Sequence, residues 1–178
     1  MASRMSKKTR LIIIAILIVA VATIVGIVLS RNASSPSDFI LPIITWNETT
    51  LSSLQGTPVV LNFWSISCPA CRMQLPYLEA VARESEGEIK VVAINMVDSA
   101  ANIRKFFVDY EPTMIIALDT NGEAFVDYCQ KHNNPQWYIP FTLFIDSEGI
   151  VQYQRIGAFA SEAVLWDTLN SVLGITIP

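Results

Sequence analysis

The chain has 178 residues, of which 52% are hydrophobic, so it is long and apolar enough to bury the core of one domain. Its formal net charge is −4, and five of its 12 Lys and Arg residues lie within the first 31 positions, ahead of all 16 Asp and Glu residues. The rest of the chain is therefore strongly acidic. Such a surface repels phosphate groups, which excludes nucleic acid from the expected partners.

The first predicted element is a membrane-spanning helix over residues 11–29. This stretch carries no charge, and at about 1.5 Å per residue it nearly crosses a hydrocarbon core of about 30 Å. Four basic residues precede it and only Arg31 follows closely, so the positive-inside bias places residues 1–10 in the cytoplasm. We therefore expect a single-pass protein of the cell membrane whose C-terminal domain lies outside the cytoplasm.

A cleaved signal peptide is the alternative interpretation of this N-terminal region. The apolar part of a signal peptide is usually shorter, about 7 to 15 residues, and ends in small residues at the cleavage site. Leu29-Ser30-Arg31 is a poor site of that kind, although Ala33 leaves cleavage open. We therefore expect an uncleaved anchor.

Residues 30–37 are rich in serine and contain Pro36, a composition typical of a short polar linker. The folded domain is then expected over residues 38–178. Strand and helix patterns alternate within it, which predicts an α/β fold with a central sheet flanked by helices. The expected strands are 59–64, 89–95, 114–118, 142–145 and 150–155, and the expected helices are 69–85, 101–110, 123–131 and 161–173.

Three local signals refine these elements. Pro76 lies inside the first helix of the domain and has no N–H to donate, so we expect a kink there. Ser161 is a plausible N-cap for the last helix, with Glu162 near the positive end of its dipole. Residues 146–149, Asp-Ser-Glu-Gly, indicate a hairpin turn between two antiparallel strands.

The motif that carries chemistry is Cys-Pro-Ala-Cys at residues 68–71, between a predicted strand and a predicted helix. Two cysteines with this spacing can close a disulfide ring, and a helix N-terminus stabilises the attacking thiolate. A zinc site would need two more ligands at comparable spacing, and the chain offers only Cys129 and His132. Two buried structural cysteines are a second alternative, which a proline at an exposed turn disfavours. The pattern therefore predicts thiol-disulfide exchange.

Residues 59–76, VVLNFWSISCPACRMQLP, resemble the active-site segment of TlpA/ResA proteins, which are membrane-anchored thiol-disulfide oxidoreductases with a thioredoxin-like fold. Residues 51–56, 139–146 and 156–158 resemble, in order, this family's approach to the first core strand, its cis-proline strand and the glycine turn beyond it. The resemblance covers residues 38–175. It implies a thioredoxin-like fold with a central mixed sheet, in which the region between Ala101 and Leu118 is the family's insertion.

The resemblance also implies roles for individual residues. Cys68 attacks the substrate, and Cys71 then breaks the mixed disulfide. Pro140 is expected to follow a cis peptide bond and to face the pair, with the backbone of Ile139 available to an extended substrate peptide. Ser67 and Trp64 complete the expected substrate-binding residues.

The implied substrates are protein thiols and disulfides, and no cofactor or metal is expected. A CxxC pair outside the cytoplasm needs an electron donor or acceptor of its own, so a membrane redox partner is expected too. Reduction of protein disulfides is the favoured direction and oxidation stays open. Cytochrome c maturation is one role that the resemblance implies.

Two positions depart from the related proteins. Thioredoxins carry a buried Asp where this chain has Asn62, and TlpA/ResA proteins commonly carry Glu where it has Gln74. The two carboxylates that would accept a proton and repel a thiolate are therefore missing, so we expect Asn62 and Gln74 to tune the pair and Cys68 to be a more acidic thiol. The same departure weakens the case for apocytochrome c as the substrate. Ser67 replaces an aromatic residue and makes the rim smaller and more polar.

Two further functions share part of this sequence pattern. A copper-delivery protein of the Sco type shares the fold and uses two cysteines and a distant histidine, which the cysteine pair and His132 could mimic, although Sco proteins have CxxxC spacing. A peroxiredoxin needs Thr or Ser three residues before its cysteine and a proline further back; Ser65 fits, but Leu61 occupies the proline position. Cys129 has two interpretations, a small apolar residue on its helix or an extra redox or metal ligand near His132.

Overall fold

The structure, a computed structural model, describes residues 7–30, 40–42 and 48–175. The chain divides into two compact units, Met1–Ser34 and Ser35–Pro178. Helix α1, Lys7–Ser30, is the described element of the first unit, so the helix expected over residues 11–29 is present. Apart from its first residue, the predicted linker over 30–37 lies outside the described residues.

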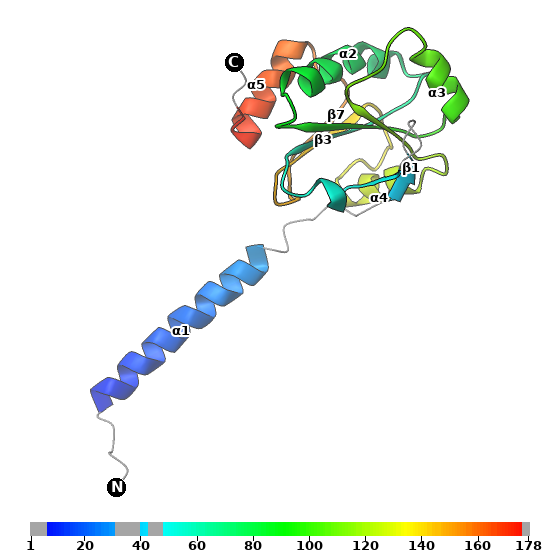
Figure 1. Cartoon of the computed structure of the whole chain (residues 1–178). Helices are drawn as coiled ribbons and strands as arrows, with labels where there is room; N and C mark the ends of the chain where they lie inside the picture. The colour runs from blue at the N-terminus through cyan, green and yellow to red at the C-terminus, as the bar shows by residue number, and fades with distance from the viewer. Residues whose placement is uncertain (1–6, 31–39, 43–47, 176–178) are drawn as a thin grey trace. The chain divides into compact units, whose positions relative to one another are not determined.

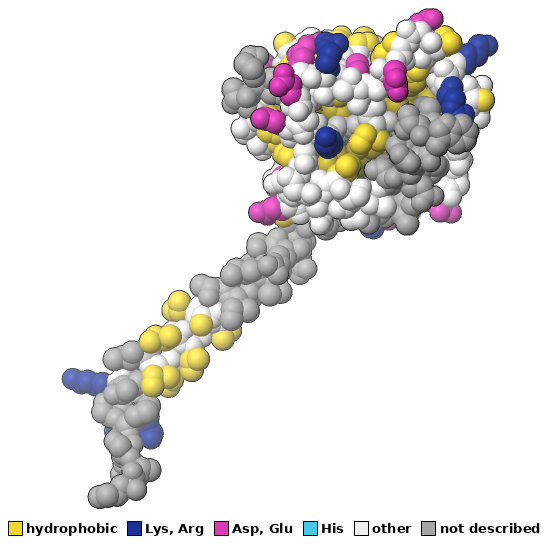
Figure 2. All heavy atoms as spheres, viewed as in Figure 1, with side chains coloured by type: hydrophobic (Ala, Val, Ile, Leu, Met, Phe, Trp, Pro, Cys, Tyr) yellow, Lys and Arg dark blue, Asp and Glu magenta, His cyan; other side chains and the backbone are white. Residues whose placement is uncertain are grey.

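The described side chains of α1 are basic at its start and then hydrophobic. Lys7, Lys8 and Arg10 precede a run of exposed aliphatic residues over 13–21 (Figure 2). None of the helices in the described residues combines the length and the hydropathy needed to cross a membrane.

The second unit is built on a five-stranded sheet with the strand order β5-β4-β3-β6-β7 (Figure 1). The central strand β3 pairs parallel with β4 on one side and antiparallel with β6 on the other. The sheet is therefore mixed, as predicted. The strands are β3, Val59–Trp64; β4, Lys90–Asn95; β5, Ile115–Leu118; β6, Phe141–Ile145; and β7, Val151–Ile156.

Helices cover both faces of this sheet (Figure 1). One face packs against α2, α3 and α5, and the opposite face packs against α4. This is the layered α/β architecture expected from the alternating strand and helix signals. The helices are α2, Pro69–Glu84; α3, Ala100–Phe106; α4, Glu123–Lys131; and α5, Glu162–Leu173.

Alternate residues of β3 face the two layers. Val60 and Trp64 pack with the residues of α2 and α5, whereas Leu61 and Phe63 pack with those of α4. All six residues of the strand are buried, as a central strand covered on both sides requires. Because side chains alternate along a strand, Asn62 lies on the same side as Val60 and Trp64, toward α2.

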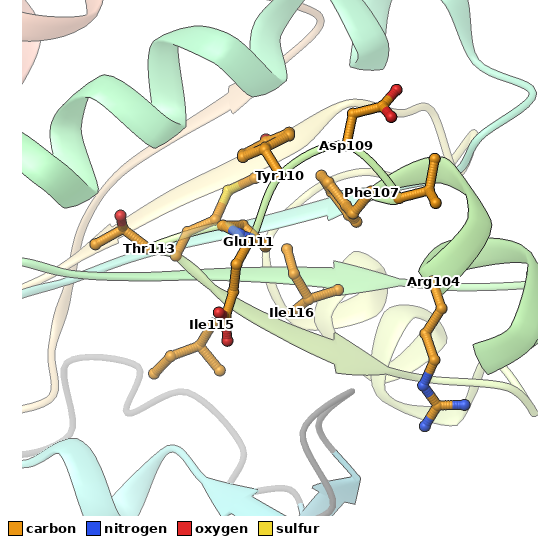
Figure 3. A pocket seen from close by; sticks show the side chains of 11 residues that line it. Arg104, Phe107, Asp109, Tyr110, Glu111, Thr113, Ile115 and Ile116 are labelled. Carbon is orange, nitrogen blue, oxygen red and sulfur yellow. The ribbon is translucent and has the colours of Figure 1, made fainter.

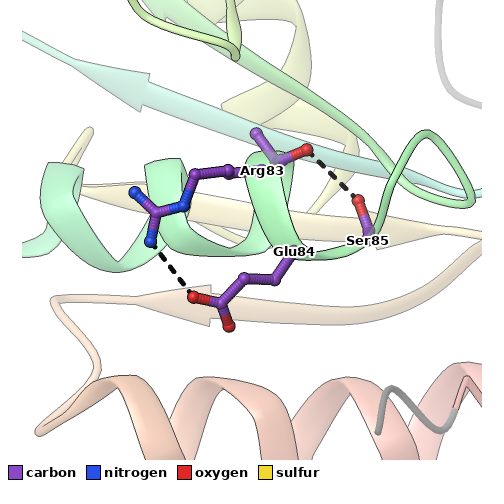
Figure 4. A network of polar contacts seen from close by, with 4 residues as sticks. Arg83, Glu84 and Ser85 are labelled. Carbon is purple, nitrogen blue, oxygen red and sulfur yellow. Dashed lines mark hydrogen bonds and ion pairs between the residues drawn. The ribbon is translucent and has the colours of Figure 1, made fainter.

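The end of α2 is tied to the approach of β4. The backbone N–H of Ser85 donates to the carbonyl of Val81 over 3.0 Å, and its hydroxyl donates to the carbonyl of Ile89 over 3.3 Å. The hydroxyl also lies 3.4 Å from the carbonyl oxygen of Ala82, to which it donates (Figure 4). The neighbouring Arg83–Glu84 pair, 3.1 Å apart, is exposed, and such pairs contribute about 0 to 1 kcal/mol. The helix continues through Pro76, and the kink expected there stays a prediction.

Several predicted boundaries are confirmed. Helix α4 has the predicted limits, and Ser161 caps α5 by accepting from the N–H of Val164 over 3.3 Å. The hairpin turn is also present, because the N–H of Gly149 donates to the carbonyl of Asp146 over 3.0 Å and Gly149 has a φ of +81°. A glycine adopts that left-handed conformation without steric cost.

At its edges the fold differs from the sequence-based prediction in two ways. The helix expected over 101–110 ends at Phe106, because Phe107 turns its ring into the core against Trp64, with 6.0 Å between the ring centres. A short antiparallel pair, β1 (Ile40–Pro42) with β2 (Glu48–Thr50), and a 3₁₀ turn, η1 (Ser52–Leu54), were not predicted. Elements of three residues are too short to show a hydrophobic period.

Candidate redox site

Cys68 and Cys71 are joined by a disulfide at the start of α2, with 5.2 Å between their Cα atoms. Cys68 is the N-cap of the helix, and the N–H of Cys71 donates to its sulfur over 3.1 Å. Pro69 occupies the first helical position, where a missing N–H costs nothing. The free N–H groups and the dipole at this end of α2 stabilise a thiolate on Cys68 once the pair is reduced.

The two cysteines differ in exposure. Cys71 is only 1% exposed and packs in the core with Leu75, whereas Cys68 is partly exposed. An incoming sulfur therefore reaches Cys68 first. This difference supports the assignment of Cys68 as the attacking cysteine and Cys71 as the resolving one.

The loop before β6 lies beside the pair, although it is 71 residues further along the chain. The Ile139–Pro140 peptide bond is cis, as predicted, and the carbonyl oxygen of Ile139 lies 3.8 Å from the sulfur of Cys68. Ser67 is exposed next to the pair, and its hydroxyl lies 3.0 Å from that of the buried Ser65. The site thus combines a disulfide with the backbone carbonyl of Ile139 in the loop before β6.

Trp64, expected among the substrate-binding residues, is buried in the core. Its side chain is 0% exposed, and its ring centre lies 5.6 Å from that of Phe106 and 6.0 Å from that of Phe107. The alternation of β3 turns this residue into the core cluster that also contains Cys71. Trp64 supports the site from within the core.

A neutral hydrogen-bond network lies one helical turn beyond Cys71. Gln74, which is 0% exposed, donates its amide to Oδ1 of Asn62 over 2.9 Å and to Oγ1 of Thr142 over 3.1 Å. The hydroxyl of Thr142 donates to Asn62 over 3.0 Å, and the Gln74 carbonyl accepts from the N–H of Phe159 over 3.0 Å. The two residues predicted to tune the pair are thus brought together. Thr142 was missed, because its place opposite Asn62 depends on the register of β3 and β6.

A carboxylate close to the pair was also missed. Oδ2 of Asp98, in the loop between β4 and α3, accepts from the N–H of Ile66 over 2.8 Å. Ile66 lies only two residues before Cys68. Its position in the sequence could have indicated this contact. Asp98 comes just after the buried strand β4, and the carboxyl ends of the parallel strands β3 and β4 lie at the same edge of the sheet.

Cys129 lies apart from the pair, on α4. It is 1% exposed and packs with Phe125 and Tyr128 on the opposite face of the sheet from Cys71. Burial raises the pKa of the Cys129 thiol to about 11, although a hydrogen bond with Asn134 opposes the shift. This thiol is protonated at neutral pH, which favours its interpretation as a small core residue.

His132 follows α4 and does not join the cysteine pair. Its ring centre lies 5.5 Å from that of Tyr128, and its side chain is 5% exposed. Burial lowers its pKa, and the charge of Asp127 opposes that shift. Within the part of the chain that the structure describes, no three His, Cys, Asp or Glu residues are grouped so that they could hold a metal ion. The copper site considered from the sequence therefore lacks its histidine.

A cavity of about 530 Å³ opens between the end of α3 and the edge strand β5 (Figure 3). Neither cysteine of the pair lines it, so it is separate from the redox chemistry. Its lining is mostly apolar, with Phe107, Val108, Tyr110, Met114 and Ile116 among the residues that form it.

Comparison with known proteins agrees with this geometry. Residues 34–154 match the AhpC/TSA family. The chain is 30% identical over 135 residues to the thioredoxin-like protein YneN of Bacillus subtilis, covering 74% of this chain and 75% of that protein. It is 28% identical over 145 residues to the thiol-disulfide oxidoreductase ResA of the same organism, covering 81% and 76%. A crystal structure from Chlorobium tepidum, named for thiol:disulfide interchange protein DsbE, is 26% identical, has a TM-score of 0.68 and covers 80% of this chain and 97% of that one.

Proposed function

The chain belongs to the AhpC/TSA family of thioredoxin-like proteins and is a thiol-disulfide oxidoreductase, and from that premise we propose that its cysteine pair reduces disulfides in proteins outside the cytoplasm. One observation carries the proposal. The partly exposed Cys68 caps α2 and lies 3.8 Å from the carbonyl oxygen of Ile139, so nucleophile and peptide-binding backbone are adjacent.

The reaction transfers two electrons from the reduced pair to the substrate. The Cys68 thiolate attacks one sulfur of the substrate disulfide, breaks that bond and releases the first substrate thiolate. Cys71 then loses its proton to water or to that thiolate and attacks the sulfur of Cys68. The mixed disulfide breaks, the second substrate thiolate leaves, and Cys68–Cys71 is oxidised.

The substrate that fits this site is an extended peptide segment carrying a disulfide. The backbone of Ile139, before the cis-proline, can pair with such a segment as an added strand does. Trp137 and Tyr138, just before it, are each more than half exposed and offer apolar surface to the flanking side chains. Cytochrome c maturation is one role of this kind, supported by the TlpA/ResA resemblance.

We also propose that residues 11–29 anchor the chain in the cell membrane and that a membrane redox partner exchanges electrons with the pair. The support is the uncharged apolar run behind four basic residues. A disulfide formed outside the cytoplasm persists unless something reduces it, so the pair needs such a partner. Fractionation of cells tests the anchor, and recovery of the chain in the soluble fraction would contradict it. Protease treatment of intact spheroplasts tests the side of the membrane, and a domain that is protected from the protease would contradict a location outside the cytoplasm.

The direction of electron flow is tested by the equilibrium potential of the pair in the full chain, measured against glutathione. A value near that of thioredoxin, about −270 mV, supports reduction, and one near that of DsbA, about −120 mV, reverses the direction. The same preparation is assayed for reduction of insulin. Faster turnover of hydrogen peroxide than of insulin would favour the peroxiredoxin alternative instead.

A further inference from the structure

We propose that Asp98 is a positioning residue for the redox reaction: its carboxylate holds the segment that presents Cys68 to the substrate. The proposal rests on the thiol-disulfide exchange proposed above. Asp98 does not touch the reacting sulfurs. It acts through Ile66, whose N–H donates to Oδ2 of Asp98 over 2.8 Å.

The need for such a contact follows from where the sheet ends. Trp64 is the last residue of β3 and pairs with Asn95 of β4, and its carbonyl accepts from the N–H of Met96 over 3.2 Å. Beyond this point the ladder between the two strands stops. The backbone of Ile66 is held instead by a side chain from the loop after β4.

Asp98 is itself held in place. The side-chain amide of Asn95 donates to its Oδ2 over 2.9 Å, and the Asn95 side-chain oxygen accepts from the N–H groups of Asp98 and Val97 over 2.9 and 3.3 Å. Asn95 is fully buried, so it provides a rigid support. A carboxylate oriented in this way loses little entropy when it binds Ile66.

The carboxylate of Asp98 does not cap the helix that follows it. Helix α3, which begins two residues later, is capped by Ser99, whose hydroxyl accepts from the N–H of Asn102 over 3.2 Å. Oδ2 of Asp98 accepts from Ile66, in the segment before the cysteine pair, and from Asn95, at the end of β4. The position therefore serves the active-site segment rather than the helix.

The consequence for the chemistry concerns the N-cap. Cys68 must stay at the start of α2 for the N–H of Cys71 to reach its sulfur at 3.1 Å. Two residues of chain span at most about 7 Å, so a shift at Ile66 is passed directly to Cys68. Loss of the anchor should weaken the stabilisation of the thiolate and raise the pKa of Cys68.

The experiment compares Asp98→Ala with Asp98→Asn in the full chain. Both variants remove the charge, but only Asn keeps an oxygen that can accept from Ile66, so the difference between them isolates positioning. We expect Cys68 in Asp98→Ala to have a pKa at least about half a unit above that in Asp98→Asn, with insulin reduction slower by about fivefold, the scale of one net hydrogen bond. Thiolate absorbance against pH and insulin turnover supply the two readouts.

Asp146→Ala is the matched control. Asp146 also accepts from loop N–H groups, those of Glu148 and Ile150, each over 2.9 Å, but it follows β6 at the end of the sheet away from the pair. Equal Cys68 pKa values in the two Asp98 variants would overturn the proposal. So would a Cys68 pKa in Asp146→Ala that differs from the wild-type value as much as the one in Asp98→Ala does. If wild-type protein itself reduces no insulin, the proposed function fails, whereas the pKa comparison still decides the role of Asp98.

Discussion

Gln74 and Asn62 are joined by a buried hydrogen bond of 2.9 Å, which ties α2 to β3 one turn beyond Cys71. The Gln74 amide also reaches Thr142 on β6, so three elements of the fold meet at one side chain. In this arrangement every group is neutral. The site therefore offers hydrogen bonds where the TlpA/ResA resemblance leads us to expect a carboxylate.

Restoring that carboxylate with Gln74→Glu should raise the pKa of Cys68. A negative charge in a buried position repels the thiolate, and the two groups titrate as a coupled pair. We expect a shift of about one unit, equivalent to about 1.4 kcal/mol. The thiolate absorbance of both proteins, titrated against pH, measures it.

Gln130→Glu is the control for this change, since Gln130 is exposed on α4. It adds the same charge without placing it in the network. Identical titration curves for Gln74→Glu and wild type would mean that position 74 does not sense the pair, and its role in tuning would have to be withdrawn.

The two cysteines should respond differently to replacement by serine. Cys68→Ser is expected to abolish insulin reduction, because the remaining thiol of Cys71 is buried. Cys71→Ser should instead accumulate mixed disulfides on Cys68, because nothing resolves them. Mass spectrometry of non-reduced protein detects these adducts. Adducts in the Cys68 variant and none in the Cys71 variant would reverse the assigned roles.

Cys129 should make stability depend on pH in the alkaline range. The unfolded chain releases this proton near its ordinary pKa of about 9, whereas burial holds the pKa of the folded thiol at about 11. The thiol therefore contributes its full stability below about pH 9, and that contribution is lost as the pH rises to about 11. Over this interval we expect the urea midpoint of wild type to fall more steeply than that of Cys129→Ala. Parallel curves would show that the thiol is not buried.

Copper binding by the reduced chain should not depend on His132. This imidazole packs beside Tyr128, whereas Cys71 packs in the core on the opposite face of the sheet. We expect His132→Ala to bind copper as wild type does, with Gln130→Ala as the control at the same end of α4. Copper that stays bound through chromatography in wild type and is lost only from the His132 variant would restore the copper-delivery alternative.

Much of the site could be predicted from sequence because its signals are local or carried by a motif. The Cys-Pro-Ala-Cys spacing at the start of a helix predicts both the disulfide and the capping position of Cys68, which depend on neighbours within one turn. The cis bond before Pro140 and the N-cap at Ser161 are of the same kind. The burial of Trp64 could not be predicted from its nearness in sequence to the cysteines, because Phe106 and Phe107, from a distant helix and the turn after it, pack against its ring.

The sequence by itself determined the redox motif, the alternation of strands and helices and the caps, since each depends on residues a few positions apart. The tertiary structure decided which distant side chains meet that motif: Asp98 at Ile66, 32 residues away, Thr142 at Gln74, 68 residues away, and the N–H of Phe159 at Gln74, 85 residues away. The physical reason is that such contacts depend on strand register and on the rotation of α2 against the sheet. Both are set by packing of the whole core, which no short segment encodes.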